Sequence, residues 1–143
     1  MDKKQLPIVF FGAVALVSFL CLNHLYYSRT KNDVNNIQIE EIGQVSIQAK
    51  GAAGHESVQI NDIEKIIQIV LLLKSAEKVQ CANEDLNKNA YQISLKSRNG
   101  TTQDVLLSKL SGSAYMLQSG QYCYRTDSLW KVVSSIKQLQ PKP

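Results

Sequence analysis

The sequence predicts an α+β protein, in which a transmembrane helix near the N-terminus is followed by a small antiparallel sheet packed with two helices. Three observations lead to this prediction. Residues 6–22 carry no charge and are almost wholly apolar, as a membrane-spanning helix requires. Several short runs alternate apolar and polar residues with period two, as half-buried strands do. Two further segments space their apolar residues as amphipathic helices do.

The length of the chain limits the number of domains. Of its 143 residues, enough for one modest core remain once the apolar segment is set aside. Hydrophobic residues make up 44% of the chain and charged residues 20%, which excludes an intrinsically disordered protein. We expect an N-terminal tail (1–5), a transmembrane signal-anchor (6–27), a polar linker (28–36), a soluble α+β domain (37–138) and a flexible tail (139–143).

The flanks of the apolar segment favour an uncleaved, single-pass anchor. Lysines precede the segment, and two tyrosines and an arginine stand at its C-terminal end, where amphipathic rings and cations meet lipid headgroups; these are Lys3, Lys4, Tyr26, Tyr27 and Arg29. A short N-terminal tail usually stays inside the cell. We therefore expect the C-terminal domain to lie outside the cytoplasm, on the cell membrane.

The segment has two alternative interpretations, a cleaved signal peptide and a lipoprotein. A cleaved signal peptide has a small-x-small candidate site only at residues 13–15, and cleavage there leaves an apolar N-terminus. A lipoprotein needs a small residue before its lipidated cysteine, but Leu20 precedes Cys21. Cys21 is then a small apolar residue in lipid.

The first half of the domain begins with alternating residues and continues with a helix. Residues 37–39 and 45–47 alternate as strands do, with Gly43 between them, and residues 51–54 form a glycine-containing loop. After residues 58–60 the period becomes helical. Asn61 is the expected N-cap, with Glu64 three residues on. Apolar residues cover most of this helix, so we expect it to be the most buried element of the domain.

The second half is expected to be an antiparallel meander closed by a helix. Alternating runs recur at residues 79–81, 91–95, 105–107, 115–117 and 122–124. Asn99-Gly100 is a strong hairpin signal between two of them, and Ser119-Gly120 is a weaker one. Thr126 or Asp127 caps a closing helix with Leu129, Val132, Val133 and Ile136 on one face and Trp130 beside them.

The sequence contains no catalytic constellation that we recognise. The only histidines are His24, in the membrane-interface region, and His55. His55-Glu56 begins like a zinc-protease helix, but Gln59 stands where the second ligand is needed. No glycine loop leads into a lysine-bearing helix, as phosphate binding would require. We therefore expect no enzyme, no metal and no cofactor; runs of basic and aromatic residues typical of nucleic-acid binding are also missing.

Two cysteines in the domain present a choice. Cys81 and Cys123 either form a disulfide, as the environment outside the cytoplasm permits, or remain small buried thiols. If both point inward to meet, strand alternation turns Tyr122 and Tyr124 outward beside Arg125. Outward tyrosines and a cation are typical of binding surfaces. Our hypothesis is a bridge with exposed tyrosines; the alternative is core tyrosines with Cys123 facing solvent.

Charge divides the soluble part into two halves. Residues 28–85 hold 6 basic and 9 acidic residues, whereas residues 86–143 hold 8 basic and 2 acidic ones. A basic half suits an acidic envelope protein or an anionic polymer; evenly spaced, solvated lysines and arginines are the simpler alternative. The candidate binding residues are Tyr122, Tyr124, Arg125, Lys96 and Arg98.

The layout from residue 6 to residue 138 resembles the small membrane-anchored cell-envelope proteins of Gram-positive bacteria. The resemblance lies in an anchor, an early helix and a meander that ends in a helix, and it carries no functional residue. Our leading hypothesis is a single-pass, non-catalytic interaction module displayed outside the cytoplasm. A protective protein of the immunity or exclusion type is the alternative, and a hydrolase of unknown type is third.

Overall fold

A computed structural model describes residues 6–50, 57–82, 86, 90–110 and 114–136, and it gives side chains in the first helix for residues 14–26. The predicted loop at 51–54, His55 and the tail at 139–143 lie outside the described residues. The chain divides into two compact units, residues 1–31 and residues 32–143.

The first unit contains one long helix, α1 (Leu6–Lys31). Its apolar side chains are distributed on all sides of the helix rather than along one stripe, and the side chains of residues 14–26 are exposed. In the part of the chain whose side chains are described, no helix has the length and apolarity that a membrane crossing demands. The helix continues four residues beyond the expected end at residue 27.

The expected polar linker at residues 28–36 is wrong, because this segment is helical and then packed. Residues 28–31 belong to α1, and the 3-10 helix η1 (Val34–Asn36) follows, capped by the Asp33 carboxylate on the Asn35 N–H. Val34 is 0% exposed. A strand at residues 37–39 is also wrong: residues 39–41 form a second 3-10 helix, η2 (Ile39–Glu41), and Ile37 turns into the core.

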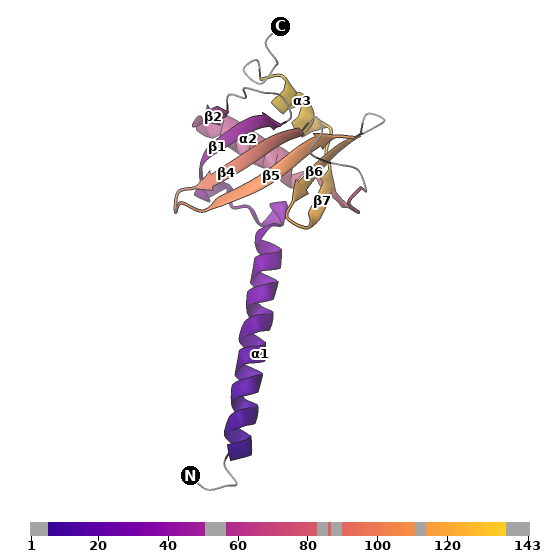
Figure 1. Cartoon of the computed structure of the whole chain (residues 1–143). Helices are drawn as coiled ribbons and strands as arrows, with labels where there is room; N and C mark the ends of the chain where they lie inside the picture. Colours follow the sequence, from indigo (N-terminus) through magenta and orange to yellow (C-terminus); the bar gives the residue numbers. More distant parts are fainter. Residues whose placement is uncertain (1–5, 51–56, 83–85, 87–89, 111–113, 137–143) are drawn as a thin grey trace. The chain divides into compact units, whose positions relative to one another are not determined.

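The second unit contains one antiparallel sheet, which confirms the α+β class. Its seven strands lie in the order β2-β1-β4-β5-β6-β7-β3, and each neighbouring pair is antiparallel. The strands are β1 (Ile42–Lys50), β2 (Val58–Ile60), β3 (Glu77–Val79), β4 (Ala90–Ser97), β5 (Thr102–Lys109), β6 (Tyr115–Ser119) and β7 (Tyr122–Arg125). Strands β4 to β7 form the predicted meander (Figure 1).

Both predicted hairpin turns are present. Asn99-Gly100 lies between β4 and β5, where Gly100 has a φ of 89° and Asn99 Oδ1 accepts from the Thr101 N–H at 3.0 Å. Gly120 lies between β6 and β7 with a φ of 57°. A residue with a Cβ adopts such angles only with strain, so glycine fixes the position of each turn.

Two helices, α2 (Ile63–Lys74) and α3 (Ser128–Ser134), cover one face of the sheet (Figure 1). Asp62 caps α2 through the N–H groups of Glu64 and Lys65, one residue later than the predicted cap at Asn61. Thr126 Oγ1 accepts from the Leu129 N–H at the start of α3. Side chains from both helices and the strands form one main core.

The prediction that α2 is the most buried element is wrong. Ile66, Ile69, Val70 and Leu73 face the core, but a second line of apolar side chains is exposed. Ile63, Ile67 and Leu71 are 54%, 38% and 53% exposed and lie four residues apart on one side of the helix. The helix rests on the sheet by one side only, so its other apolar residues stay in solvent.

Candidate binding face

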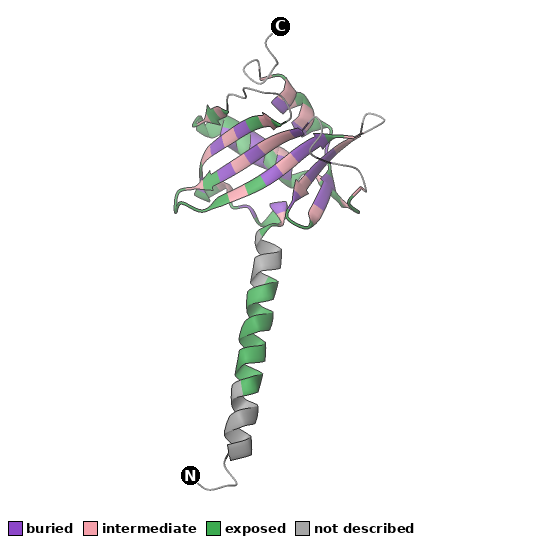
Figure 2. Cartoon of the chain, in the orientation of Figure 1, coloured by how far each residue is buried: buried purple, intermediate pink, exposed green. Residues whose placement is uncertain are grey.

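Strand alternation and register divide the side chains of the sheet into two faces. The helix face is the one under α2 and α3, and it holds the main core, including Ile47, Ile93, Val105 and Leu107. The opposite face, which we call the open face, alternates with these residues and is mostly polar. Figure 2 shows the alternation as buried residues between exposed and half-buried ones along the strands. The side chains of the open face include Gln44, Ser46, Gln48, Lys50, Gln92, Ser94, Lys96, Asp104, Leu106 and Gln118.

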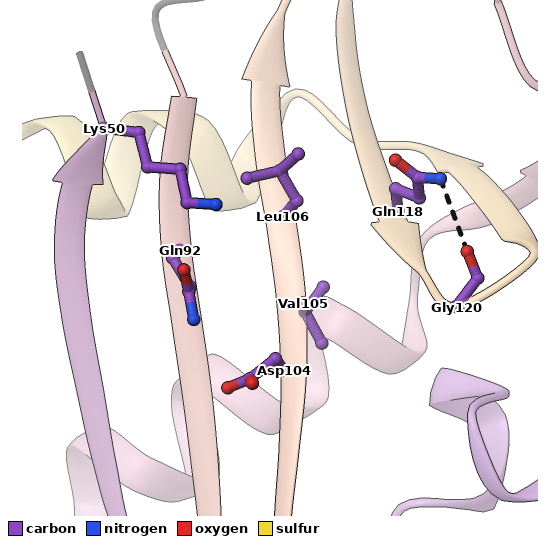
Figure 3. Close-up of a pocket in the computed structure, with 7 residues that line it drawn as sticks. All are labelled: Lys50, Gln92, Asp104, Val105, Leu106, Gln118 and Gly120. Atoms are coloured by element: carbon purple, nitrogen blue, oxygen red, sulfur yellow. Dashed lines mark hydrogen bonds between the residues drawn. The ribbon is translucent and has the colours of Figure 1, made fainter. Parts of the chain in front are cut away.

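A shallow hollow lies on the open face over β1, β4, β5 and β6. Its lining includes backbone or side-chain atoms of Lys50, Gln92, Asp104, Val105, Leu106, Gln118 and Gly120. Figure 3 shows Lys50 extending from β1 across β4, toward the middle of the hollow. Strands that are adjacent in the sheet, rather than loops, therefore position most of these groups.

The centre of the hollow is a row of three side chains on adjacent strands. Leu106 is the register partner of Gln92 on one side and of Gln118 on the other. The Gln118 amide donates to the Gly120 carbonyl at 3.3 Å, and its amide oxygen is directed back over the sheet (Figure 3). An apolar side chain thus stands between two primary amides, each of which has both donor and acceptor atoms.

Opposite charges lie on either side of this row. Lys50 lies two residues along β1 from this row, because Gln48 is the register partner of Gln92 whereas Lys50 pairs with Ala90. Asp104 lies two residues before the row on β5, and it accepts a hydrogen bond from the Ser94 hydroxyl at 2.5 Å. Both charged residues are exposed. The hollow therefore presents a cation at one end and a carboxylate at the other.

The open face is covered where it reaches β6 and β7. Leu86 packs there against Met116 and Cys123 in a second, smaller apolar cluster. A disulfide joins Cys81 to Cys123, with 5.1 Å between the two Cα atoms. The Ser108 hydroxyl also donates to the Leu86 carbonyl. These contacts hold the chain after β3 against the sheet and leave the hollow beside it open.

The hypothesis of two outward tyrosines is wrong for Tyr124, which is 0% exposed. Strand β7 is covered on both faces, so Cys123 can be buried under the second cluster while Tyr124 is buried in the main core. Tyr122 shares the helix face and is half-buried, with the Lys78 ammonium 3.8 Å from its ring centre. Alternation places Cys123 and Tyr124 on opposite faces, and both are buried because both faces of β7 are covered.

The basic candidates do not form one patch with the tyrosines. Lys96 is exposed on the open face of β4, and Arg98 is exposed in the β4–β5 turn, where its N–H donates to the Glu41 carbonyl at 2.8 Å. Arg125 is exposed on β7, three strands away from β4 in the sheet. Lys96 shares the open face with the hollow and lies two residues from Ser94 on β4.

Tyr124 contributes to a polar cluster that holds the start of the second unit. Its hydroxyl donates to Asp33 Oδ1 at 2.8 Å, and Lys78 Nζ lies 3.2 Å from Asp33 Oδ2. Burial opposes ionisation of Asp33, but the hydrogen bonds from Asn35, Tyr124 and Lys78 outweigh it and lower the pKa of this carboxyl. Burial, and then the bond to Asp33, raises the pKa of Tyr124.

The residues of the hollow were missed at the level of sequence. Lys50, Gln92, Asp104 and Gln118 are common surface residues, and none of them belongs to a sequence motif that marks a binding site. The available signal was alternation: each is next to a residue of its strand whose side chain points to the helix face, so each faces the other side of the sheet. The predicted meander makes β4, β5 and β6 neighbours, but the place of β1 beside β4 depends on the sheet order, which the sequence did not provide.

Comparison with protein-family models, curated proteins and solved structures finds no match for this chain.

Proposed function

We propose that this chain is a non-catalytic binding module, anchored in a membrane by residues 6–27, that displays its α+β domain outside the cytoplasm. A protein partner from the cell envelope binds to the open face of the sheet. The hollow over β1, β4, β5 and β6 is the single observation that carries the proposal.

The composition of α1 supports the anchor. Residues 6–22 are uncharged, and apolar residues occupy all sides of the helix. A helix that is apolar all round needs an apolar environment on every side. Leu16, Phe19 and Leu22 are 63%, 65% and 67% exposed in the chain alone, so lipid is the environment we assign to them.

The disulfide supports a domain outside the cytoplasm. Disulfides form and persist in oxidising compartments and are rare in the cytosol. Cys123 is 1% exposed and lies in an apolar cluster, so the bridge with Cys81 fastens the covered end of the open face. The disulfide of the domain is therefore consistent with an oxidising compartment outside the cytoplasm.

The open face supports a binding role because it is polar, hollowed and flanked by a covered region. Gln92, Leu106 and Gln118 are half-buried, which leaves part of each side chain available to a ligand. Amides that donate and accept, with an apolar side chain between them, suit the mixed surface of a protein. Among the described residues, neither the Lys50 nor the Gln92 side chain has a hydrogen-bond or ion-pair partner that would have to be displaced.

Photo-crosslinking in intact cells tests the binding face. A photoreactive amino acid replaces Gln92 in the hollow or, as a matched control, Gln68 on the exposed side of α2. We expect a discrete crosslinked protein from position 92 and none of the same mass from position 68. Equal products from both positions, or no product from position 92, would contradict the proposal.

Membrane extraction and thiol labelling test the anchor and the compartment. We expect the full chain to stay in the membrane pellet at alkaline pH, and a chain lacking residues 6–27 to leave it. Non-reducing peptide analysis of the membrane-bound chain should recover Cys81 and Cys123 as one linked pair. Recovery of both as free thiols would contradict a domain outside the cytoplasm.

A further inference from the structure

The charges at the two ends of the hollow restrict the kind of protein segment that can bind there. We propose that the hollow binds an extended polypeptide segment with an acidic side chain and a basic side chain four residues apart and an apolar side chain midway between them. This inference rests on the proposed function, because it names the kind of partner segment that the open face receives.

The spacing follows from the strand geometry. Lys50 lies two residues beyond the row of Gln92 and Leu106, and Asp104 lies two residues before it. Each pair of strand residues rises about 7 Å, so the two charged rows are about 14 Å apart along the strands. An extended ligand covers the same distance in about four residues, and its residues i, i+2 and i+4 face the same side.

The lateral offset between the two charges is reduced by the lysine side chain. Lys50 and Asp104 are on β1 and β5, with β4 between them. Figure 3 shows the Lys50 side chain extending over β4, toward Leu106. A segment that runs along β4 and β5 therefore crosses the row of Lys50 first, the row of Leu106 next and the row of Asp104 last.

The two amides suit the backbone of such a segment. An extended chain presents N–H and C=O groups along both its edges, and each needs a partner when water is displaced. Gln92 and Gln118 stand on opposite sides of Leu106 in the same row. Their amide groups are thus placed to bond to the two edges of a chain whose apolar side chain contacts Leu106.

Asp104 distinguishes this ligand from a plain anionic polymer. The net charge of residues 86–143 is positive, which by itself favours a polyanion. Within the hollow, however, the Asp104 carboxylate is exposed beside the central row. A ligand that is acidic along its whole length would place like charges opposite this group, which costs binding free energy.

Titration of the full chain in detergent micelles with three peptides tests the inference. The peptides share a glycine background and carry Glu-Gly-Leu-Gly-Lys, Glu-Gly-Leu-Gly-Glu or Lys-Gly-Leu-Gly-Lys, and NMR chemical shifts report the Kd. We expect the first peptide to bind about tenfold more tightly than the other two. The Lys50→Glu variant should reverse the order and prefer the third peptide, whereas Lys65→Glu on α2 should leave the order unchanged.

The outcomes separate this inference from the proposed function. If position 92 crosslinks to a partner but the three peptides bind equally, or the first produces no shift at millimolar concentration, the inference is wrong and the binding module stands. If Lys50→Glu weakens the first two peptides but Asp104→Lys changes none, the site is an anion site and the inference is also wrong. If position 92 captures nothing, the binding module itself is wrong.

Discussion

The helix face and the open face are built from the same strands but hold different chemistry. On β5, Val105 and Leu107 are 1% and 0% exposed under the helices, whereas Asp104 and Leu106, which alternate with them, face the hollow. One face buries apolar area, which is the main favourable contribution to folding. The other face keeps polar groups half-exposed, where they contribute little to stability and remain available for binding.

The difference shows how a sheet separates stability from binding at alternate residues of one strand. Each residue on the helix face is surrounded by core side chains, and its substitution creates a cavity. The side chains that face the hollow are exposed or half-buried, so their substitution removes less packed area. The covered end at β7 is the exception, because there the open face also carries an apolar cluster.

The largest expected effect is at that covered end. Cys81→Ser removes the bridge to Cys123, which joins two cysteines 42 residues apart in the sequence. The chain-entropy relation for such a loop gives a loss of about 4 kcal/mol in the free energy of unfolding. Chemical denaturation of the variant and of the oxidised wild type in micelles measures the loss, and reduction of the wild type should reproduce it. A loss below about 1 kcal/mol would show that the cluster holds this end without the bridge.

Neighbouring leucines on β5 compare the two faces directly. Leu107→Ala leaves a cavity in the main core and should cost about 3 kcal/mol, whereas Leu106→Ala, on the half-exposed side, should cost about 1 kcal/mol. Denaturation of the two variants side by side checks the difference. Equal losses would mean that the open face contributes to stability as the helix face does, and the proposed separation would fail.

A smaller effect is expected at the polar cluster on the helix face. Tyr124→Phe removes the hydrogen bond to Asp33 and should cost about 1.5 kcal/mol near neutral pH. The folded pKa of Asp33 lies below its ordinary value of 3.8. The stabilisation is therefore present above that value and is lost as the pH falls through the folded pKa.

Thermal unfolding as a function of pH measures this dependence. The wild type should lose part of its stability below about pH 4, and Asp33→Asn should flatten that acid limb. Asp104→Asn, on the open face, is the matched control and should leave the acid limb in place. An acid limb that is unchanged in Asp33→Asn would contradict the assigned role of the cluster.

The sequence was sufficient for the meander but not for the burial of its last strand. Alternation located β4, β5, β6 and β7, because each side of a strand repeats every second residue. Asn99-Gly100 and Gly120 gave the turns, because positive φ favours these residues. The burial of both Cys123 and Tyr124 was missed, since it depends on the chain after β3, which folds over the open face from 42 residues away.

Short apolar runs were the other source of error. Ile37 and Ile39 alternate like a strand, but three residues are too few to separate a strand from a turn that directs one isoleucine inward. On α2, apolar residues on most sides predicted full burial, yet Ile63 and Leu71 are exposed because only one side of the helix meets the sheet. The hollow also required the pairing of β1 with β4, which local patterns do not contain.

The most direct test of the account combines binding and stability in one variant. Gln92→Ala with Gln118→Ala removes both amides of the hollow from the full chain. With a photoreactive group at Gln48, on the same open face, we predict loss of the crosslinked partner and an unfolding free energy within about 0.5 kcal/mol of the wild type. Undiminished capture by this variant, or equal loss in Gln68→Ala, would contradict a binding site on the open face.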